Sequence, residues 1–146
     1  MYHYQTCGLE NVWLTNGFEH SETVYGTAVA VADVLGLDRE IALTLAVKIA
    51  PLSGREVRFL RKHMELSQES LGSLLGIGAQ SIALWEKERS PIPRTSEKLL
   101  RLIALGHCNG HATIRKAIDQ INIDDNARHG ARMVFRESGN RWQYVA

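Results

Sequence analysis

Between residues 79 and 87 the chain carries a carboxamide, a hydroxyl, small apolar groups and a cation at adjacent positions. Gln80 can both donate and accept hydrogen bonds, so it can pair with an adenine in the major groove of DNA. Ala79, Ala83 or Leu84 could pack on a thymine methyl, and Ser81 completes the same first helical turn. The alternatives are that Gln80 is a hydrated surface amide and that Leu84 is partly buried against the next helix.

A second group of residues has the chemistry to hold phosphates. Lys87, Arg89 and Arg94 follow the run expected to read bases and could clamp a nucleic-acid backbone, although each alone could simply be hydrated. Gln68 is expected at the start of a helix, where its side chain and the free N–H groups can bind a phosphate. The alternative for Gln68 is a plain capping function.

Two helix starts precede these residues. Ser53-Gly-Arg-Glu56 has the pattern of a capping box. Ser67 is expected to cap a second helix, Gln68 to Leu75, which Gly76 ends because glycine adopts the left-handed conformation without steric cost. The residues expected inward are Val57, Leu60 and Met64 on the first helix, then Leu71, Leu74 and Leu75 on the second.

A third helix should begin after Gly78, with Ile82 and Trp85 buried one turn apart. Two prolines then break the chain before a fourth helix. These are Pro91 and Pro93, followed by a helix from Thr95 to Leu105 with Leu99, Leu102 and Ile103 inward.

The second and third helices have the spacing of a helix-turn-helix. Two helices joined by about four residues cross steeply, so a small residue is needed at the crossing, and Gly72 stands there. Gly76 supplies the turn, while Ile82 and Trp85 anchor the third helix from below. The opposite face of the third helix is then free to enter a major groove.

This stretch resembles the Xre/Cro-type helix-turn-helix, in which the pattern L-S-Q…L…L-G…W-E recurs. The resemblance runs through Leu66-Ser-Gln-Glu-Ser-Leu-Gly-Ser-Leu-Leu-Gly-Ile-Gly-Ala-Gln-Ser-Ile-Ala-Leu-Trp-Glu86 and covers about 55 residues, from Ser53 to His107. It implies a structural ion pair between Arg61 and Glu86. Where that family often has glycine, this chain has Glu88, so the helix end must close differently or be strained.

The flanks resemble the MqsA-like (YgiT-type) antitoxins and related regulators, through Cys7-Gly-Leu-Glu-Asn-Val-Trp-Leu-Thr-Asn-Gly-Phe joined to Leu52-Ser-Gly-Arg-Glu-Val-Arg-Phe-Leu-Arg61. Zinc-binding members have paired C-x-x-C motifs, whereas here Cys7 is matched by Glu10 and no second pair follows. Neither His3, Cys7 and His20 nor His107-Cys108-x-x-His111 has the spacing of a structural zinc site. We therefore expect no metal, and this departure from the family weighs against the toxin-binding role that the resemblance implies.

The segment before the helices should be rich in strands. Val12-Trp13-Leu14 is a short β-type run, Asn16-Gly17 is a strong hairpin signal, and Phe18 to Val31 could return as one or two strands around Gly26. A helix should then start at Asp38 as its N-cap. Its apolar spacing is carried by Ile41, Leu45 and Ile49, up to Pro51.

The segment after the helices predicts a short helix and a hairpin. The helix carries Ile114, Ile118 and Ile121 on one side. The hairpin joins Arg132–Arg136 to Arg141–Val145 around Ser138-Gly139-Asn140. Its aromatic side chains, which are Phe135, Trp142 and Tyr144, suit a dimer element, a lid or ordinary core packing.

Composition excludes several classes of protein. Hydrophobic residues make up 45% of the 146, which is ordinary for a globular chain, and the net charge is +1. From Ser53 to Leu105 nine arginines and lysines face six glutamates, a local excess of three positive charges that favours DNA without requiring it. No signal peptide, membrane-spanning stretch or catalytic motif is present, so the sequence predicts a cytoplasmic protein that is not an enzyme and needs no cofactor.

The sequence therefore predicts an α+β fold, with a four- to five-helix Xre/Cro-type bundle between β-rich ends. The expected domains are residues 1–51, 52–107 and 108–146. The expected function is a dimeric regulator of transcription that binds double-stranded DNA and represses its own operon. Two alternatives are an antitoxin with a toxin protein as partner, using the region from Tyr2 to Val31, and a ligand-sensing or phage-type regulator.

Overall fold

The computed structural model describes residues 1–110, 116 and 132–145. This part of the chain contains five helices and three separate two-stranded antiparallel sheets, which confirms the predicted α+β class. The helices are α1 (Val34–Val47), α2 (Gly54–His63), α3 (Gln68–Leu75), α4 (Ala79–Glu86) and α5 (Arg94–Cys108). The strands are β1 (Tyr2–His3), β2 (Trp13–Leu14), β3 (Phe18–Thr23), β4 (Gly26–Val31), β5 (Phe135–Ser138) and β6 (Arg141–Tyr144).

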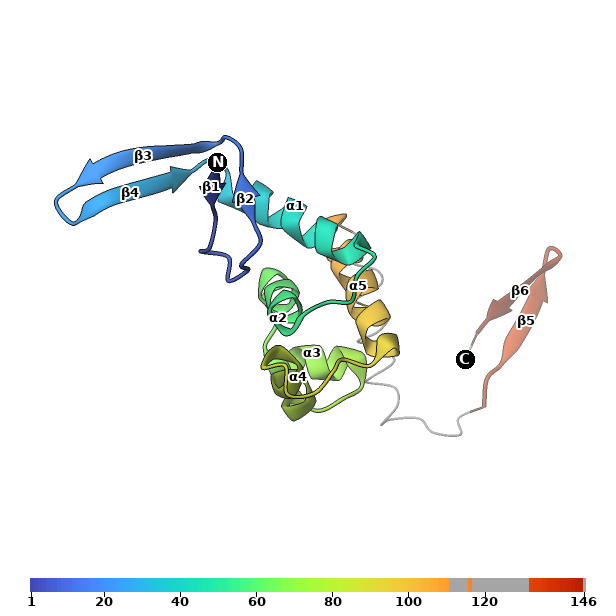
Figure 1. Cartoon of the computed structure of the whole chain (residues 1–146). Coiled ribbons are helices and arrows are strands. Elements are labelled where there is room, and N and C mark those ends of the chain that lie inside the picture. The colour runs from blue at the N-terminus through green and yellow to red at the C-terminus, as the bar shows by residue number, and fades with distance from the viewer. Residues whose placement is uncertain (111–115, 117–131, 146) are drawn as a thin grey trace.

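The first and last of the helices, α1 and α5, lie side by side although they are far apart in the sequence (Figure 1). The short helices α2, α3 and α4 gather against this pair, with α4 in contact with both α2 and α3. The hairpin of β3 and β4 projects from the end of the bundle at which α1 begins. The bundle is therefore closed by contacts between its first and last helices.

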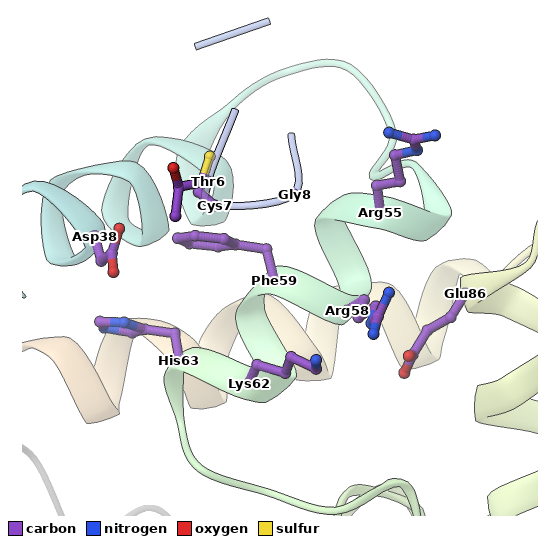
Figure 2. A pocket seen from close by; sticks show the side chains of 10 residues that line it. All are labelled: Thr6, Cys7, Gly8, Asp38, Arg55, Arg58, Phe59, Lys62, His63 and Glu86. Atoms are coloured by element: carbon purple, nitrogen blue, oxygen red, sulfur yellow. The ribbon is translucent and has the colours of Figure 1, made fainter. Parts of the chain in front are cut away.

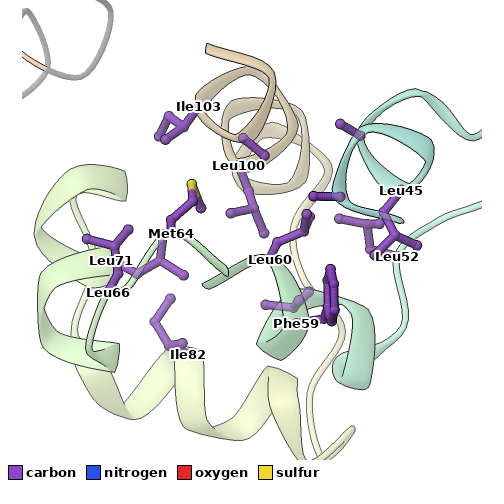
Figure 3. Close-up of a cluster of buried hydrophobic side chains, with 14 of the residues drawn as sticks. Leu45, Leu52, Phe59, Leu60, Met64, Leu66, Leu71, Ile82, Leu100 and Ile103 are labelled. Carbon is purple, nitrogen blue, oxygen red and sulfur yellow. The ribbon is translucent and has the colours of Figure 1, made fainter. Parts of the chain in front are cut away.

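One hydrophobic core unites the helices (Figure 3). Its largest fully buried side chains include Leu60 from α2, Leu71 from α3, Ile82 from α4 and Leu100 from α5. Helix α1 adds Ala42, Leu45 and Ala46 to the same cluster, and Leu52 follows in the connection to α2. The core therefore contains residues from both sides of position 51, and the division into domains stays a prediction.

The predicted N-cap at Asp38 is wrong. Helix α1 begins five residues earlier, with Asp33 as the N-cap, whose side chain accepts a hydrogen bond from the Gly36 N–H at 3.1 Å. At the other end α1 stops at Val47, and the expected inward residue Ile49 is fully exposed. Pro51 prevents the helix from continuing, because it has no N–H to donate to the Val47 carbonyl and its ring disfavours the helical conformation at Ala50.

Side chains from α2 and α5 fasten the chain where α1 ends. The Arg101 guanidinium on α5 donates hydrogen bonds to the carbonyl oxygens of Leu45, at 3.2 Å, and Ala50, at 2.8 Å, and also to that of Lys48. The Lys48 ammonium in turn forms an ion pair with Glu56 on α2. These contacts satisfy carbonyl groups that a helix end leaves without intrahelical partners.

The predicted hairpin at Asn16-Gly17 is also wrong. Strand β2 pairs with β1, with Tyr2 opposite Leu14, instead of pairing with β3. Strand β3 pairs with β4, and the chain reverses after Thr23, whose hydroxyl donates to the Gly26 carbonyl oxygen and accepts from the Tyr25 N–H. This local hydroxyl-stabilised turn closes the hairpin of β3 and β4, which confirms the two strands predicted around Gly26 within Phe18 to Val31.

The capping pattern of the central helices is confirmed. Ser53 accepts from the Glu56 N–H at 3.2 Å, and Glu56 accepts from the Ser53 N–H at 2.8 Å, which completes the capping box. Ser67 caps α3 by accepting from the Ser70 N–H at 2.9 Å. Gly76 ends α3 in the left-handed conformation with φ of +73°.

Helix α5 is longer than predicted, and one of its inward residues is wrong. Leu102 is 50% exposed, while Leu100, Ile103 and Ala104 are buried. Helix α5 packs against α1, and Leu100, Ile103 and Ala104 form its buried side. The helix predicted at Ile114, Ile118 and Ile121 lies outside the described residues. The C-terminal hairpin forms as β5 and β6, with Gly139 and Asn140 at positive φ in its turn.

Candidate nucleic-acid interface

The turn between α3 and α4 requires glycine at two positions. A Cβ on Gly72 would lie 2.6 Å from the carbonyl oxygen of Ile77, closer than side chains tolerate. Gly76 ends α3 at positive φ, and the Ile77 N–H then donates back to the Gly72 carbonyl oxygen at 2.8 Å. The two helices can therefore cross at close range, in the helix-turn-helix arrangement that the spacing predicts.

Helix α4 is anchored on one side and open on the other. Ile82 is fully buried and Trp85 is 6% exposed, so this side is fixed in the core. Gln80, Leu84 and Lys87, which follow one another at intervals of four and three residues, are all exposed. Ala79, Ser81 and Ala83 are half-buried beside them. Leu84, at 43% exposure, is a large apolar group directed to solvent rather than covered by α5.

The scaffold beneath α4 is held by an ion pair. The guanidinium of Arg61 binds the Glu86 carboxylate through two hydrogen bonds, from Nε at 2.7 Å and from Nη2 at 2.8 Å. Both side chains are largely buried, and Arg61 also donates to the carbonyl oxygen of Leu66 at 3.0 Å. This pair joins α2 to the last residue of α4 and also fixes the connection that leads into α3.

Gln68 belongs to the same network. It is half-buried at the start of α3, and its side-chain N–H group lies 3.5 Å from Glu86 Oε1. Sequence reasoning placed Gln68 at a phosphate or in a capping role and missed this contact. The pairing of Arg61 with Glu86, together with a polar residue opening α3, is the signal that could have suggested it.

The departure from glycine at Glu88 has a defined structural outcome. Glu88 adopts φ of +58°, and the Arg89 N–H donates to the Leu84 carbonyl oxygen, which closes the end of α4. Its carboxylate accepts a hydrogen bond from the Gly54 N–H at 3.0 Å, at the start of α2. A negative charge at a helix N-terminus is favourable. The contact of the Glu88 carboxylate with the start of α2 therefore offsets part of the cost of placing a residue other than glycine at positive φ.

The expected phosphate-binding cations do not all lie together. Lys87 is the C-cap of α4 and is exposed. Arg89 follows it and shares a hollow of about 280 Å³ with Trp85 and Glu88. Arg94 begins α5 and shares a different hollow with Ile49 and Pro51, on the connection between α1 and α2.

The titratable groups with shifted pKa lie away from the outer face of α4. Burial raises the pKa of the Asp38 carboxyl on α1, with His63 opposing the change. Burial also lowers the pKa of His63, and nearby His107 adds to this. In the described part of the chain, no three His, Cys, Asp or Glu side chains form a group that could hold a metal ion. Across residues 1–110, 116 and 132–145, no helix has the length and apolar character needed to cross a membrane.

Comparison with known proteins adds one relative. The chain is similar to repressor protein C2 of Salmonella phage P22, with 30% identity over 81 residues. That stretch is 56% of this chain and 37% of the phage repressor, so the chain spans well under half of that protein's length. No protein-family model and no solved structure matches. The resemblance of the flanks to MqsA-like antitoxins, and with it a toxin partner, therefore stays a prediction, whereas the chain is distantly similar, over part of its length, to a phage repressor.

Proposed function

We propose that this chain is a regulator of transcription that binds specific sites on double-stranded DNA and represses transcription from them. The observation that carries the proposal is the outer face of α4, where Gln80, Leu84 and Lys87 are exposed while Ile82 and Trp85 hold the helix to the core. An α-helix of this kind fits the major groove, and its N-terminal residues reach base edges. The similarity to a phage repressor supports the same function.

In this proposal each residue of the face has a role. Gln80 pairs with a base edge, and Ala79, Ser81, Ala83 and Leu84 fit the surrounding groove wall. Backbone phosphates are bound by Gln68 at the start of α3 and by the three cations Lys87, Arg89 and Arg94. Arg61 and Glu86 do not touch DNA and instead keep α4 at its angle.

We further propose that the chain acts as a homodimer on a pseudo-palindromic operator, with half-sites about one DNA turn apart. The C-terminal hairpin supports this, because the register of β5 and β6 places Phe135 opposite Tyr144 and puts Trp142 on the same face. All three aromatic side chains are exposed, and a lone two-stranded hairpin is only marginally stable in water. Packing of two such faces would bury them.

The experiment is fluorescence anisotropy with the duplex upstream of the protein's own gene, against a shuffled duplex of equal composition, at near-physiological salt. The proposal predicts a preference for the upstream duplex of on the order of a thousandfold or more. Equal and weak binding to both duplexes would contradict autorepression. A selection from random duplexes then separates a remote operator from the absence of specific binding, which would overturn the proposal itself.

A further inference from the structure

A cavity of about 670 Å³ lies between the N-terminal loop, α1 and the outer side of α2 (Figure 2). Thr6, Cys7 and Gly8 form one wall, Asp38 belongs to α1, and the remaining wall is mostly α2. Small-molecule sites in proteins measure about 300–1,000 Å³, so this volume is suited to a ligand of modest size. The proposed DNA contacts on α4 do not use this cavity.

Three cations on α2 line the cavity. Arg55, Arg58 and Lys62 are spaced by three and four residues, so they share one side of the helix, where like charges repel one another. Arg55 forms an ion pair with Glu10 at 2.9 Å. Among the residues that the structure describes, neither Arg58 nor Lys62 has an ion-pair partner. Both side chains are exposed, so their positive charges are accessible to an anionic ligand.

The two carboxylates of the lining do not cancel this excess. Glu86 is already bound by Arg61 through two hydrogen bonds. Asp38 remains, with one oxygen buried without a hydrogen-bond partner within the described residues, and its single negative charge cannot offset the charges of both Arg58 and Lys62. His63 has a lowered pKa because of burial, so it is mainly neutral near pH 7.

The cavity has an aromatic end as well as a cationic end. In Figure 2 the Phe59 ring and the His63 ring are directed toward Asp38 and the loop with Cys7, whereas Arg58 lies toward Glu86. The two rings are stacked with their centroids 6.1 Å apart and their planes 4° from parallel. This end of the cavity is therefore lined by two aromatic rings, of which Phe59 is mostly packed in the core and exposes only 8% of its surface.

We propose that this cavity binds a small organic anion with a carboxylate or phosphate group beside Arg58 and Lys62 and a flat aromatic body beside Phe59. Since Glu86, the last residue of α4, also lines the cavity and is held by Arg61, a bound ligand would border the helix proposed to read DNA. The ligand site does not depend on DNA binding, because the cavity and its charges exist without DNA.

The test is an NMR titration of the ¹⁵N-labelled full chain, without DNA, with phenyl phosphate as the probe. We expect saturable shifts of the backbone amides of Gly8, Arg58 and Lys62, with a Kd in the millimolar range or tighter. Inorganic phosphate, which lacks the ring, and phenol, which lacks the charge, should each bind several-fold more weakly. Shifts spread evenly over the chain, or equal affinity for all three probes, would overturn the proposal.

The matched variants are Arg58→Gln and Lys62→Gln, with Lys98→Gln as the control, because Lys98 is an exposed cation on α5 outside the cavity. Each cavity variant should weaken phenyl phosphate on the order of tenfold, while the control leaves the Kd unchanged. If the wild-type chain fails to bind the probe and the cavity variants instead weaken binding to DNA, the cations belong to a nucleic-acid surface and the proposal is wrong. Because the titration contains no DNA, its result is independent of whether the chain binds an operator.

Discussion

Glu65 and Glu88 end their helices in the same left-handed conformation, with φ of +57° and +58°, but their side chains have different surroundings. Glu88 caps α2 through the Gly54 N–H, whereas no side-chain hydrogen bond of Glu65 is found within the described residues. A left-handed L-residue costs about 1–2 kcal/mol relative to glycine. The two glutamates therefore have the same backbone strain, and only Glu88 adds a capping hydrogen bond, so comparing them isolates the contribution of that bond.

Replacing Glu65 with glycine should raise the free energy of unfolding by about 1 kcal/mol, because it removes strain and no contact. The variant Glu88→Gly removes the same strain and also the cap, which contributes about 1 kcal/mol, so its net change should be close to zero. Urea unfolding of both variants measures the difference. Equal stabilisation by both would mean that the bond from Gly54 contributes nothing.

The crossing of α3 and α4 should not tolerate a methyl group. Gly72→Ala places a Cβ 2.6 Å from the Ile77 carbonyl oxygen, and we expect a loss of about 2–3 kcal/mol in the free energy of unfolding. Gly78→Ala is the control, since a Cβ there meets nothing within 4 Å, and it should cost less than about 1 kcal/mol. Thermal unfolding compares the two, and similar losses would show that the close approach does not matter.

The pair of Arg61 and Glu86 should behave as a unit. Glu86→Leu alone leaves the Arg61 guanidinium largely buried without its partner and should cost about 3–5 kcal/mol. The double variant Arg61→Met with Glu86→Leu should recover a large part of that loss, because no unpaired charge remains. A double-mutant cycle by chemical denaturation gives the coupling. Additive losses would show that the two side chains contribute independently.

His63 should make the stability depend on pH. Its folded pKa is lowered from 6.5, so the unfolded state takes up its proton at higher pH than the folded state. The stability contributed by this group is therefore complete above pH 6.5 and is lost as the pH falls from 6.5 through the folded value. Asp38, whose folded pKa is raised from 3.8, acts oppositely, with stability lost as the pH rises through its folded value.

The measurement is the free energy of unfolding at pH 7.5, 6.5 and 5.5, pH values that we choose to bracket the unfolded pKa of histidine at about 6.5. His63→Asn should reduce the loss between the highest and lowest pH. His20→Asn is the control, because His20 is exposed on β3. An unchanged profile in the His63 variant would assign the pH dependence to another group.

Base reading by Gln80 predicts a loss of specificity rather than of general affinity. Gln80→Ala should lose about 1–3 kcal/mol of discrimination at one base pair while keeping its affinity for non-specific duplex. Lys87→Gln should instead weaken all duplexes and reduce the slope of log K against log salt by about 0.9. Anisotropy on an operator and its single-base variants tests both. Parallel loss of specific and non-specific binding in the Gln80 variant would remove this residue from base readout.

The helices with strong local signals were predictable from the sequence. Ser53 and Ser67 each stand directly before a helix whose apolar residues recur with helical spacing. Gly76 ends α3 because this position requires the left-handed backbone conformation that glycine adopts easily. Gly72 could be identified because the close crossing is a requirement of the motif. In each case the information lies within a few residues of the position concerned.

Features that depend on distant residues were missed. Strand β2 pairs with β1, whose residues lie about ten positions earlier in the sequence. The Asn16-Gly17 dipeptide gives no information on whether β2 pairs with β1 or with β3. Asp33 and Asp38 are equally plausible caps by residue type, and the structure shows the capping hydrogen bond at Asp33, from the Gly36 N–H. The cap from Glu88 to Gly54 joins residues 34 positions apart, so no local pattern announces it.

The fastening of α1 by Arg101 has a consequence for the mechanics of the molecule. Because the connection from Lys48 to Ala50 is bound to α5 and Lys48 is also paired with α2, the end of α1 cannot swing without breaking contacts to both helices. Leu52 is held in the same way, by a hydrogen bond from its N–H to Glu97. The segment between α1 and α2 is therefore tied to both α2 and α5, so a displacement of the end of α1 would have to move these helices or break the contacts.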